Sequence, residues 1–286
     1  MIFVFSLHIF LGGDVMLDNW VEERFLRGER GFGSRLNIPD SALFLVNLEG
    51  PFGRDGKKAD KEFTFLVDPS LVEILREMKV DGVTLANNHM MDYGPEALYE
   101  TMKVLKKEGI KFCGAGSNLD EALKPAIFEM GNEKVALLSF SNTFPESFYA
   151  GKDKPGTAQG SYANVRKGIE LAKEEGASLI IVAFHWGGEK LDTAKAYQRH
   201  LARYAIDMGA DVVFGHHPHV LQPVEIYKNR VIAYSLGNLL FSSYGVGNGG
   251  LLEIVWDGGI KEVYLWRVEE KKKFYPERGR RERIYP

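Results

Sequence analysis

The chain has 286 residues, of which 45% are apolar and 12% aromatic, which is enough for a sizeable buried core. Its formal net charge is -3, so no basic excess points to a nucleic-acid partner. The single cysteine, Cys113, excludes an intramolecular disulfide and a thiolate metal cluster. Any bound metal would need His, Asp, Glu or Asn ligands, which suit Mn, Zn or Fe.

In the first part of the chain, predicted strands alternate with helices. The apolar run at 2–11 predicts a buried strand that leads into Gly12–Gly13–Asp14, because it lacks a positive n-region and is too short to span a bilayer; a trimmed signal remnant is the less favoured alternative. The elements predicted after this strand are a short helix at 18–27, a strand at 40–48, a Gly- and Lys-rich loop at 52–61, an extended run at 63–67, a helix at 69–78, a strand at 80–86, a helix at 95–108 and a strand at 110–113.

In the second part, a hairpin is predicted from 126–130 and 135–140, across Gly131–Asn132. A long irregular segment at 142–161 follows, and loops of that length are often functional. Next come a helix at 165–175, a strand at 179–184, a helix at 193–208, a strand at 212–214 and short strands at 224–227, 231–235, 239–241, 251–256 and 263–268. The pattern predicts one α/β domain at 1–270 and a charged, partly ordered tail at 271–286.

Polar residues of metal-ligand type follow many of these strands directly. They are Asp14, Glu49, Asn88 and His89, His185, and the loop His216–His217–Pro218–His219. Ligands in α/β proteins bind outside the carboxyl ends of strands. Crowded imidazoles repel one another as cations, but as neutral rings they can share a metal ion. The pattern therefore predicts a site for divalent cations, in which a carboxylate could bridge two ions about 3.5–4 Å apart.

Several short motifs together carry a family resemblance. They are GDVML at Gly13, NLEGP at Asn47, LANNHMMDYG at Leu85, GAG at Gly114, HWG at His185, GHHPHVLQ at Gly215 and YSLGN at Tyr234. In this order they resemble the CapA family, proteins linked to poly-γ-glutamate capsule synthesis and similar in fold to calcineurin-like metallophosphoesterases. The resemblance covers residues 10–242 or so and implies a four-layer α/β/β/α sandwich with a dinuclear site.

The resemblance also implies a role for individual residues. Asp14 takes the place of the first metal-binding Asp, and Glu49 that of the bridging carboxylate. Asn88 and His185 would bind one ion together with His217, whereas His219 would bind the other with Asp14. His89 matches the histidine that gives a proton to the leaving oxygen while an activated water attacks phosphorus in line. One or two ions of Mn, Fe or Zn are expected.

The sequence departs from the phosphoesterase pattern at Met16, because phosphoesterases usually carry Asp-x-His in their first motif and Met16 stands at the position of that histidine. The second metal site would then be one ligand short, and it would bind its ion weakly, recruit a group such as His216, or stay empty. Otherwise His216 is expected to support the ligands, as is Asn238. Asp92 either orients His89 or caps the helix that begins at Pro95, and the sequence favours neither.

Two functions follow from the resemblance. One is a metal-dependent phosphoesterase linked to capsule synthesis; the other is a non-hydrolytic assembly factor that keeps the metal site and binds an anionic polymer. Partners would be an anionic small molecule or polymer and a membrane capsule-synthesis complex. An extracytoplasmic location is implied by the resemblance, although the sequence shows no clear signal or anchor.

Overall fold

The computed structural model describes residues 6–242, 249–271 and 275–285. Its larger sheet has eight strands in the order β16–β15–β14–β1–β2–β3–β4, and β13 also pairs with β1. These strands are β1 (Leu7–Val15), β2 (Leu43–Leu48), β3 (Gly82–Thr84), β4 (Lys111–Cys113), β13 (Asn238–Leu240), β14 (Gly249–Trp256), β15 (Ile260–Lys271) and β16 (Tyr275–Tyr285).

The second sheet has six strands in the order β11–β12–β10–β9–β7–β6. They are β6 (Ala126–Met130), β7 (Glu133–Ser141), β9 (Leu179–His185), β10 (Val212–His216), β11 (Val224–Tyr227) and β12 (Arg230–Ala233). β6 and β7 form the predicted antiparallel hairpin. Two short strands, β5 (Ala115–Gly116) and β8 (Gly156–Thr157), pair separately, so β8 lies within the segment predicted to be irregular.

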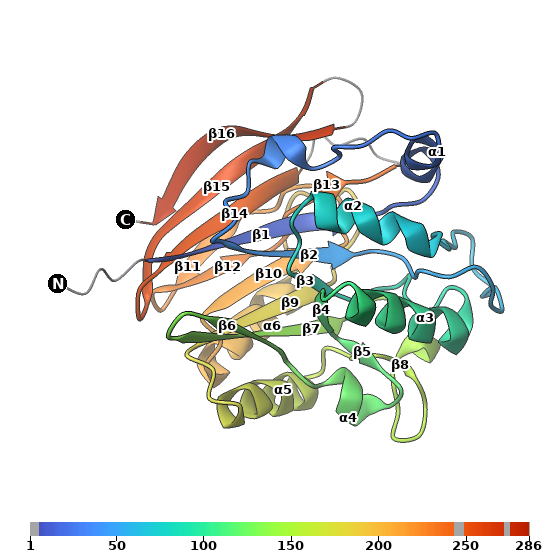
Figure 1. Cartoon of the computed structure of the whole chain (residues 1–286). Helices are drawn as coiled ribbons and strands as arrows, with labels where there is room; N and C mark the ends of the chain where they lie inside the picture. Colours follow the sequence, from blue (N-terminus) through green and yellow to red (C-terminus); the bar gives the residue numbers. More distant parts are fainter. Residues whose placement is uncertain (1–5, 243–248, 272–274, 286) are drawn as a thin grey trace.

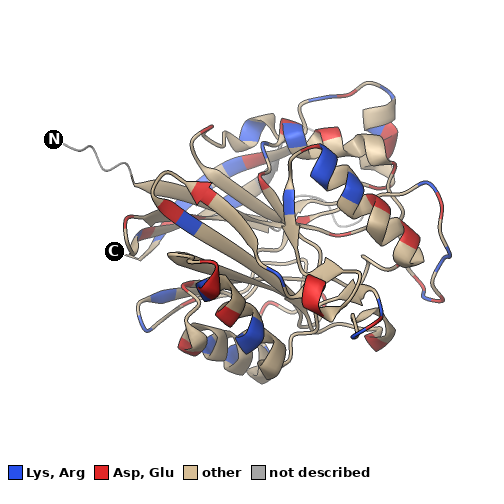
Figure 2. Cartoon of the chain, turned by 60° about the horizontal axis from the view of Figure 1, so that its bottom comes forward, with Lys and Arg blue, Asp and Glu red and all other residues tan. Residues whose placement is uncertain are grey.

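The helices cover the outer faces of both sheets (Figure 1). They are α1 (Trp20–Leu26), α2 (Val72–Glu77), α3 (Gly94–Lys107), α4 (Leu119–Ala122), α5 (Tyr162–Glu174) and α6 (Ala196–Met208), with 3-10 turns η1 (Ser34–Leu36), η2 (Pro69–Leu71) and η3 (Glu146–Phe148). α5 begins earlier than predicted because Ser161 caps it, its side chain accepting a hydrogen bond from Asn164 N. In Figure 2, basic and acidic residues are interspersed along the helices, whereas the strands are mostly uncharged.

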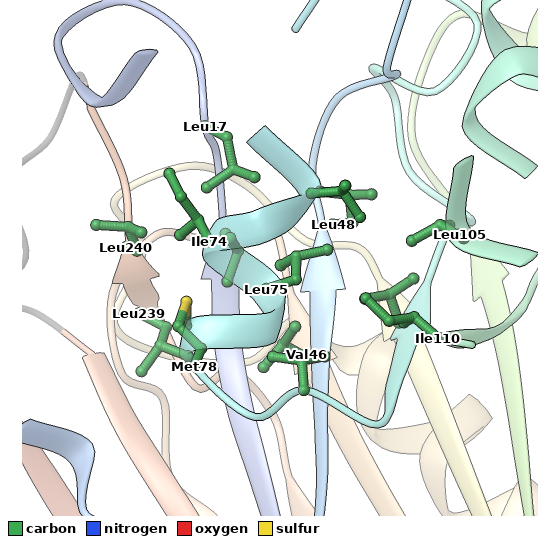
Figure 3. Close-up of a cluster of buried hydrophobic side chains, with 14 of the residues drawn as sticks. Leu17, Val46, Leu48, Ile74, Leu75, Met78, Leu105, Ile110, Leu239 and Leu240 are labelled. Carbon is green, nitrogen blue, oxygen red and sulfur yellow. The ribbon is translucent and has the colours of Figure 1, made fainter. Parts of the chain in front are cut away.

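Successive side chains along a buried strand point to opposite faces of its sheet, so each strand contributes to two layers of the core. In β1, Ile9 and Leu11 face the core between the sheets, while Phe10 faces the core under α1, α2 and α3. In β9, Ile181 packs between the sheets, while Val182 packs beneath α5 and α6. The four-layer α/β/β/α sandwich is therefore confirmed. Figure 3 shows the outer core of the larger sheet, where Ile74 and Leu75 of α2 pack over Val46 of β2 and Leu239 of β13.

Within the segment expected to be a charged, partly ordered tail, Tyr275–Tyr285 forms the edge strand β16, and residues 272–274 and 286 lie outside the described residues. β16 pairs antiparallel with β15, and two arginines stack on the aromatic rings of that strand. The guanidinium carbon of Arg281 lies 3.4 Å from the ring centroid of Tyr264, and that of Arg278 lies 4.3 Å from the centroid of Trp266. Stacking of this kind lets charged side chains bury their stems against apolar surface. Within the described ranges, no helix has the length and apolar character that crossing a membrane requires.

Candidate metal centre

The predicted strand ends meet at one edge of the sandwich and come from both sheets. Asp14 lies in β1 and Glu49 directly after β2, in the larger sheet. His185 and His216 are the last residues of β9 and β10, in the second sheet. These four side chains are at most 1% exposed. Because fully buried charged and imidazole groups need partners, their convergence marks a built polar site.

Close backbone approaches fix these strand ends. A Cβ on Gly13 would lie 2.0 Å from Gly237 O, and one on Gly215 would lie 1.9 Å from Tyr234 O, so neither position has room for a side chain. Beyond β10, His217 has φ 90° and His219 has φ 58°. Non-glycine residues in this left-handed region are strained, and such strain is concentrated at functional sites.

Asp14 is the centre of a polar network. Its Oδ1 accepts a hydrogen bond of 2.8 Å from Asn47 Nδ2 and lies 3.2 Å from His216 Nδ1. Its Oδ2 lies 3.4 Å from His219 Nδ1 and accepts a 3.3 Å hydrogen bond from the His217 backbone N–H. Burial alone would raise the pKa of Asp14, but the contacts with His216 and His219 outweigh it and hold that pKa well below its ordinary value.

Glu49 points into a ring of imidazoles. Its Oε1 lies 3.7 Å from His219 Nε2, 3.8 Å from His185 Nε2 and 3.9 Å from His89 Nε2. Neither carboxylate oxygen has a hydrogen-bond partner among the described residues, and the side chain is 1% exposed. Burial, together with the neighbouring charge of Asp14, raises the pKa of Glu49 well above its ordinary value.

The donor set fits divalent cations. One group of ligand atoms, from Asp14, Glu49 and His185, lies within 4.8 Å of one another, and so does a second group from Glu189, His217 and His219. Within the described part of the chain, both oxygens of Glu49 and Nδ1 of His217 are buried polar atoms without a hydrogen-bond partner, and a cation would supply one. The expected pairing of ligands into two sets stays a prediction.

The histidines differ in charge state. Burial and the neighbouring His219 lower the pKa of His217 to about 3, and burial also holds the pKa of His185 well below its usual value. Both rings are therefore neutral near pH 7, the form that ligates metals. Burial would lower the pKa of His219 as well, but Glu49 and Asp14 outweigh it and raise that pKa to about 9.

His89 is held by a carboxylate and a lysine. Its Nδ1 lies 2.7 Å from Asp92 Oδ2, while Asp92 Oδ1 accepts a 2.7 Å hydrogen bond from Lys61 Nζ. Lys61 Nζ also donates to the Asn88 carbonyl at 2.6 Å. α3 has no side-chain cap from Asp92, since its N-cap is Tyr93. Of the two roles considered for Asp92, the geometry favours orienting His89.

The two residues expected to support the ligands lie next to proposed ligands in the structure. Asn238 Oδ1 is 2.9 Å from His219 Nδ1, and His216 contacts Asp14 as given above. Asn88 Oδ1 lies 2.8 Å from His185 Nε2, at the proposed ligand position. Met16 is fully buried, and a Cβ built on Gly50 would lie 3.2 Å from its Sδ, so the sulfur packs close to the backbone of Gly50, the residue after Glu49.

Sequence reasoning missed three residues of this site. Asn47 is buried and joins Asp14 to Thr84, whose Oγ1 donates to Asn47 Oδ1 at 3.0 Å. Its signal was a lone amide within the apolar strand LFLVNL. Glu189 follows His185 by four residues, a spacing that could have drawn attention. Lys61 gave no signal, because its partners come from another loop.

Comparison with known proteins gives consistent matches. The family model for the bacterial capsule synthesis protein PGA_cap matches residues 8–243. The PGA biosynthesis protein CapA of Bacillus subtilis (strain 168) is 34% identical over 237 residues, covering 80% of this chain and 62% of that protein. The capsule biosynthesis protein CapA of Bacillus anthracis is 33% identical over 239 residues, covering 80% of this chain and 58% of that protein. The chain thus spans about three fifths of the length of these relatives.

Solved structures show the same fold at low identity. The NAD nucleotidase (NadN) of Haemophilus influenzae matches with a TM-score of 0.52 at 13% identity, covering 96% of this chain and 60% of that one. The protein TT1561 of Thermus thermophilus matches with a TM-score of 0.51 at 12% identity, covering 87% of this chain and 94% of that one. The architecture is that of the metallophosphoesterase fold, and at this identity the likeness concerns the fold alone.

Proposed function

The chain belongs to the bacterial capsule synthesis protein PGA_cap family, and from that premise we propose that it is a metal-dependent phosphoesterase that acts in capsule or poly-γ-glutamate synthesis. The observation that carries the proposal is Glu49, a buried carboxylate surrounded by three imidazoles with both oxygens lacking a hydrogen-bond partner among the described residues. A charge placed this way is costly unless a cation compensates it.

The residues that would hold the ions are Asp14, Glu49, Asn88, His185, His217 and His219. Divalent cations bound there would draw charge from a phosphoryl group and lower the pKa of an attacking water. The neutral rings of His185 and His217 offer nitrogen lone pairs without first losing a proton near pH 7.

His89 is the group we assign to the leaving oxygen. Asp92 binds its Nδ1, so its Nε2 is the nitrogen that faces Glu49 and the centre. Lys61 fixes Asp92 from the other side, which keeps the ring orientation constant. With Nδ1–H donated to Asp92, Nε2 carries a proton only when the ring is doubly protonated. Burial lowers the pKa of His89, and Asp92 opposes that effect by favouring the protonated ring. In that form the Nε2 proton would pass to the departing oxygen, which is a general-acid role.

The test replaces His89 by Ala and measures p-nitrophenyl phosphate hydrolysis with added manganese. We expect turnover to fall about 10²–10⁴-fold, the usual effect of losing a positioned proton donor, while elemental analysis finds unchanged metal. His200→Ala, a change on α6 away from the site, is the matched control. Full metal occupancy with no hydrolysis of any monoester or diester in a panel would refute the proposal.

The second candidate function is a capsule-assembly factor that binds an anionic polymer without hydrolysing a substrate. Met16 favours it, because a methionine stands where phosphoesterases usually have a histidine ligand. One tightly bound metal ion, no hydrolysis and measurable binding of poly-γ-glutamate would together support it. In either role we place the protein with a membrane capsule-synthesis complex, outside the cytoplasm.

A further inference from the structure

A pocket of about 280 Å³ opens directly beside the metal centre. His89 and His219 form its inner wall, and three phenylalanines, Phe63, Phe65 and Phe241, form much of the rest. The volume lies just below the usual range for small-molecule sites, so the pocket has room for a small group. Whatever enters it lies next to the proposed proton donor.

The phenylalanines are packed against the site histidines. The Phe65 ring centroid lies 4.5 Å from that of His89, and the Phe241 centroid lies 4.7 Å from that of His219. Phe63 is 63% exposed at the rim. A group that leaves from the centre toward His89 would therefore meet aromatic surface and would cover Phe63.

The exposed position of Phe63 is imposed by its neighbours. Two residues before it, Lys61 binds Asp92, and two residues after it, the Phe65 backbone N–H donates to Asp92 Oδ2 at 2.9 Å. Val67 N donates to Pro51 O at 3.0 Å. Since the backbone on both sides is tied to the site, Phe63 is held at the rim of the pocket.

The charges around the pocket disfavour a polyanion. Glu62 contributes a carboxylate and Glu189 a second one, on the side of the proposed ligands His217 and His219, while the lysine of the lining, Lys61, is engaged with Asp92. Extra carboxylates on a ligand would be repelled here, whereas a neutral apolar group would gain from leaving water.

We propose that this pocket receives the leaving group of the substrate and selects phosphoesters of small apolar alcohols, aromatic or short isoprenoid, with Phe63 as the specificity-determining residue. This inference rests on the hydrolase function proposed above. The phosphoryl group is then bound at the metal centre, and the ester oxygen that departs toward His89 carries its apolar substituent into the pocket.

The experiment compares benzyl phosphate with glycerol 3-phosphate, whose leaving alcohols differ little in acidity but greatly in polarity. With manganese added, we expect kcat/KM to favour benzyl phosphate by about tenfold or more, from burial of one ring. Phe63→Ala should raise KM for benzyl phosphate severalfold and should change KM for glycerol 3-phosphate much less. Tyr99→Ala, which removes an exposed ring from α3, is the control and should change neither.

Dimethylallyl phosphate in the same assay separates an isoprenoid from an aromatic leaving group, and a preference for either over glycerol 3-phosphate supports the proposal. Calorimetry with benzylphosphonate and methylphosphonate gives a readout that needs no turnover. Equal kcat/KM for benzyl and glycerol esters would overturn the pocket assignment while leaving the hydrolase function intact.

Absence of all turnover combined with Phe63-dependent binding of benzylphosphonate would refute the hydrolase function and support the pocket. If neither turnover nor Phe63-dependent binding of benzylphosphonate is found, the hydrolase function and the pocket assignment are both refuted. Displacement of benzylphosphonate from the wild-type protein by tri-γ-glutamate would also overturn the assignment, because it would place a polycarboxylate in the pocket.

Discussion

Replacing Glu49 by Gln should have opposite effects on stability with and without metal. Without metal, the carboxylate is buried, lacks hydrogen-bond partners among the described residues and lies near Asp14. Its burial costs several kcal/mol, offset in part by attraction to His219, whose Nε2 is 3.7 Å away. Gln keeps the shape and removes the charge, so we expect the metal-free variant to be more stable by about 1–2 kcal/mol.

With metal bound, the wild-type protein should be more stable than the Gln variant. A cation at one hundred times its dissociation constant would stabilise the wild-type protein by about 2.7 kcal/mol. The Gln variant lacks the negative charge of this ligand, so the cation should add little to its free energy of unfolding. Each kcal/mol corresponds to about 2–4 °C in Tm for a chain near this size. The variant should therefore have the higher Tm in EDTA, and the wild-type protein should have the higher Tm in manganese.

The assay is thermal unfolding followed by circular dichroism in EDTA and in a manganese series. Glu253→Gln serves as the control, since this buried carboxylate has partners in Trp266 and Arg281 and should lose stability in both buffers. The reasoning fails if Glu49→Gln melts below the wild type in EDTA, or if manganese shifts both proteins equally.

Three further outcomes follow from the geometry. Lys61→Met should lower kcat about 10–100-fold with metal content unchanged, because Asp92 loses the contact that fixes it. Lys61→Arg should recover most of the rate, and an equal loss in both variants would contradict this role of Lys61. Met16→His should raise the manganese stoichiometry measured by elemental analysis, and Met16→Leu should not; an unchanged stoichiometry would show that the missing ligand is not at this position. Gly215→Ala should destabilise the fold by more than about 3 kcal/mol in urea unfolding, because its Cβ would meet Tyr234 O, whereas Gly259→Ala, in open space, should stay within about 0.5 kcal/mol.

The strand-end residues could be predicted because buried strands leave a clear record in the sequence. The runs before Asp14 and His185 are apolar over most of their length, and the first polar side chain after such a run lies at the carboxyl edge of the sheet. The helix at α3 was predictable for a similar reason, since its apolar residues recur at helical spacing.

Other features depend on contacts that no local pattern records. Lys61 lies 31 positions from Asp92 in an irregular segment, so only the folded chain brings them together. β16 was misjudged because a run rich in arginine suggests a solvated tail. Its strand character comes from pairing with β15 and from the rings of Tyr264 and Trp266, which cover the arginine stems.

The proposed metal ligands come from both sheets, and this has a mechanical consequence. Asp14 and Glu49 belong to the larger sheet, and His185 and His217 belong to the second sheet or the loop that follows it. A cation bound by residues of both sheets would cross-link the two halves of the sandwich at one edge. The lone cysteine of the chain can form no internal disulfide that would do the same. Sliding of one layer past the other would then break coordination bonds, so removal of the ion should loosen the packing between the sheets as well as the site itself.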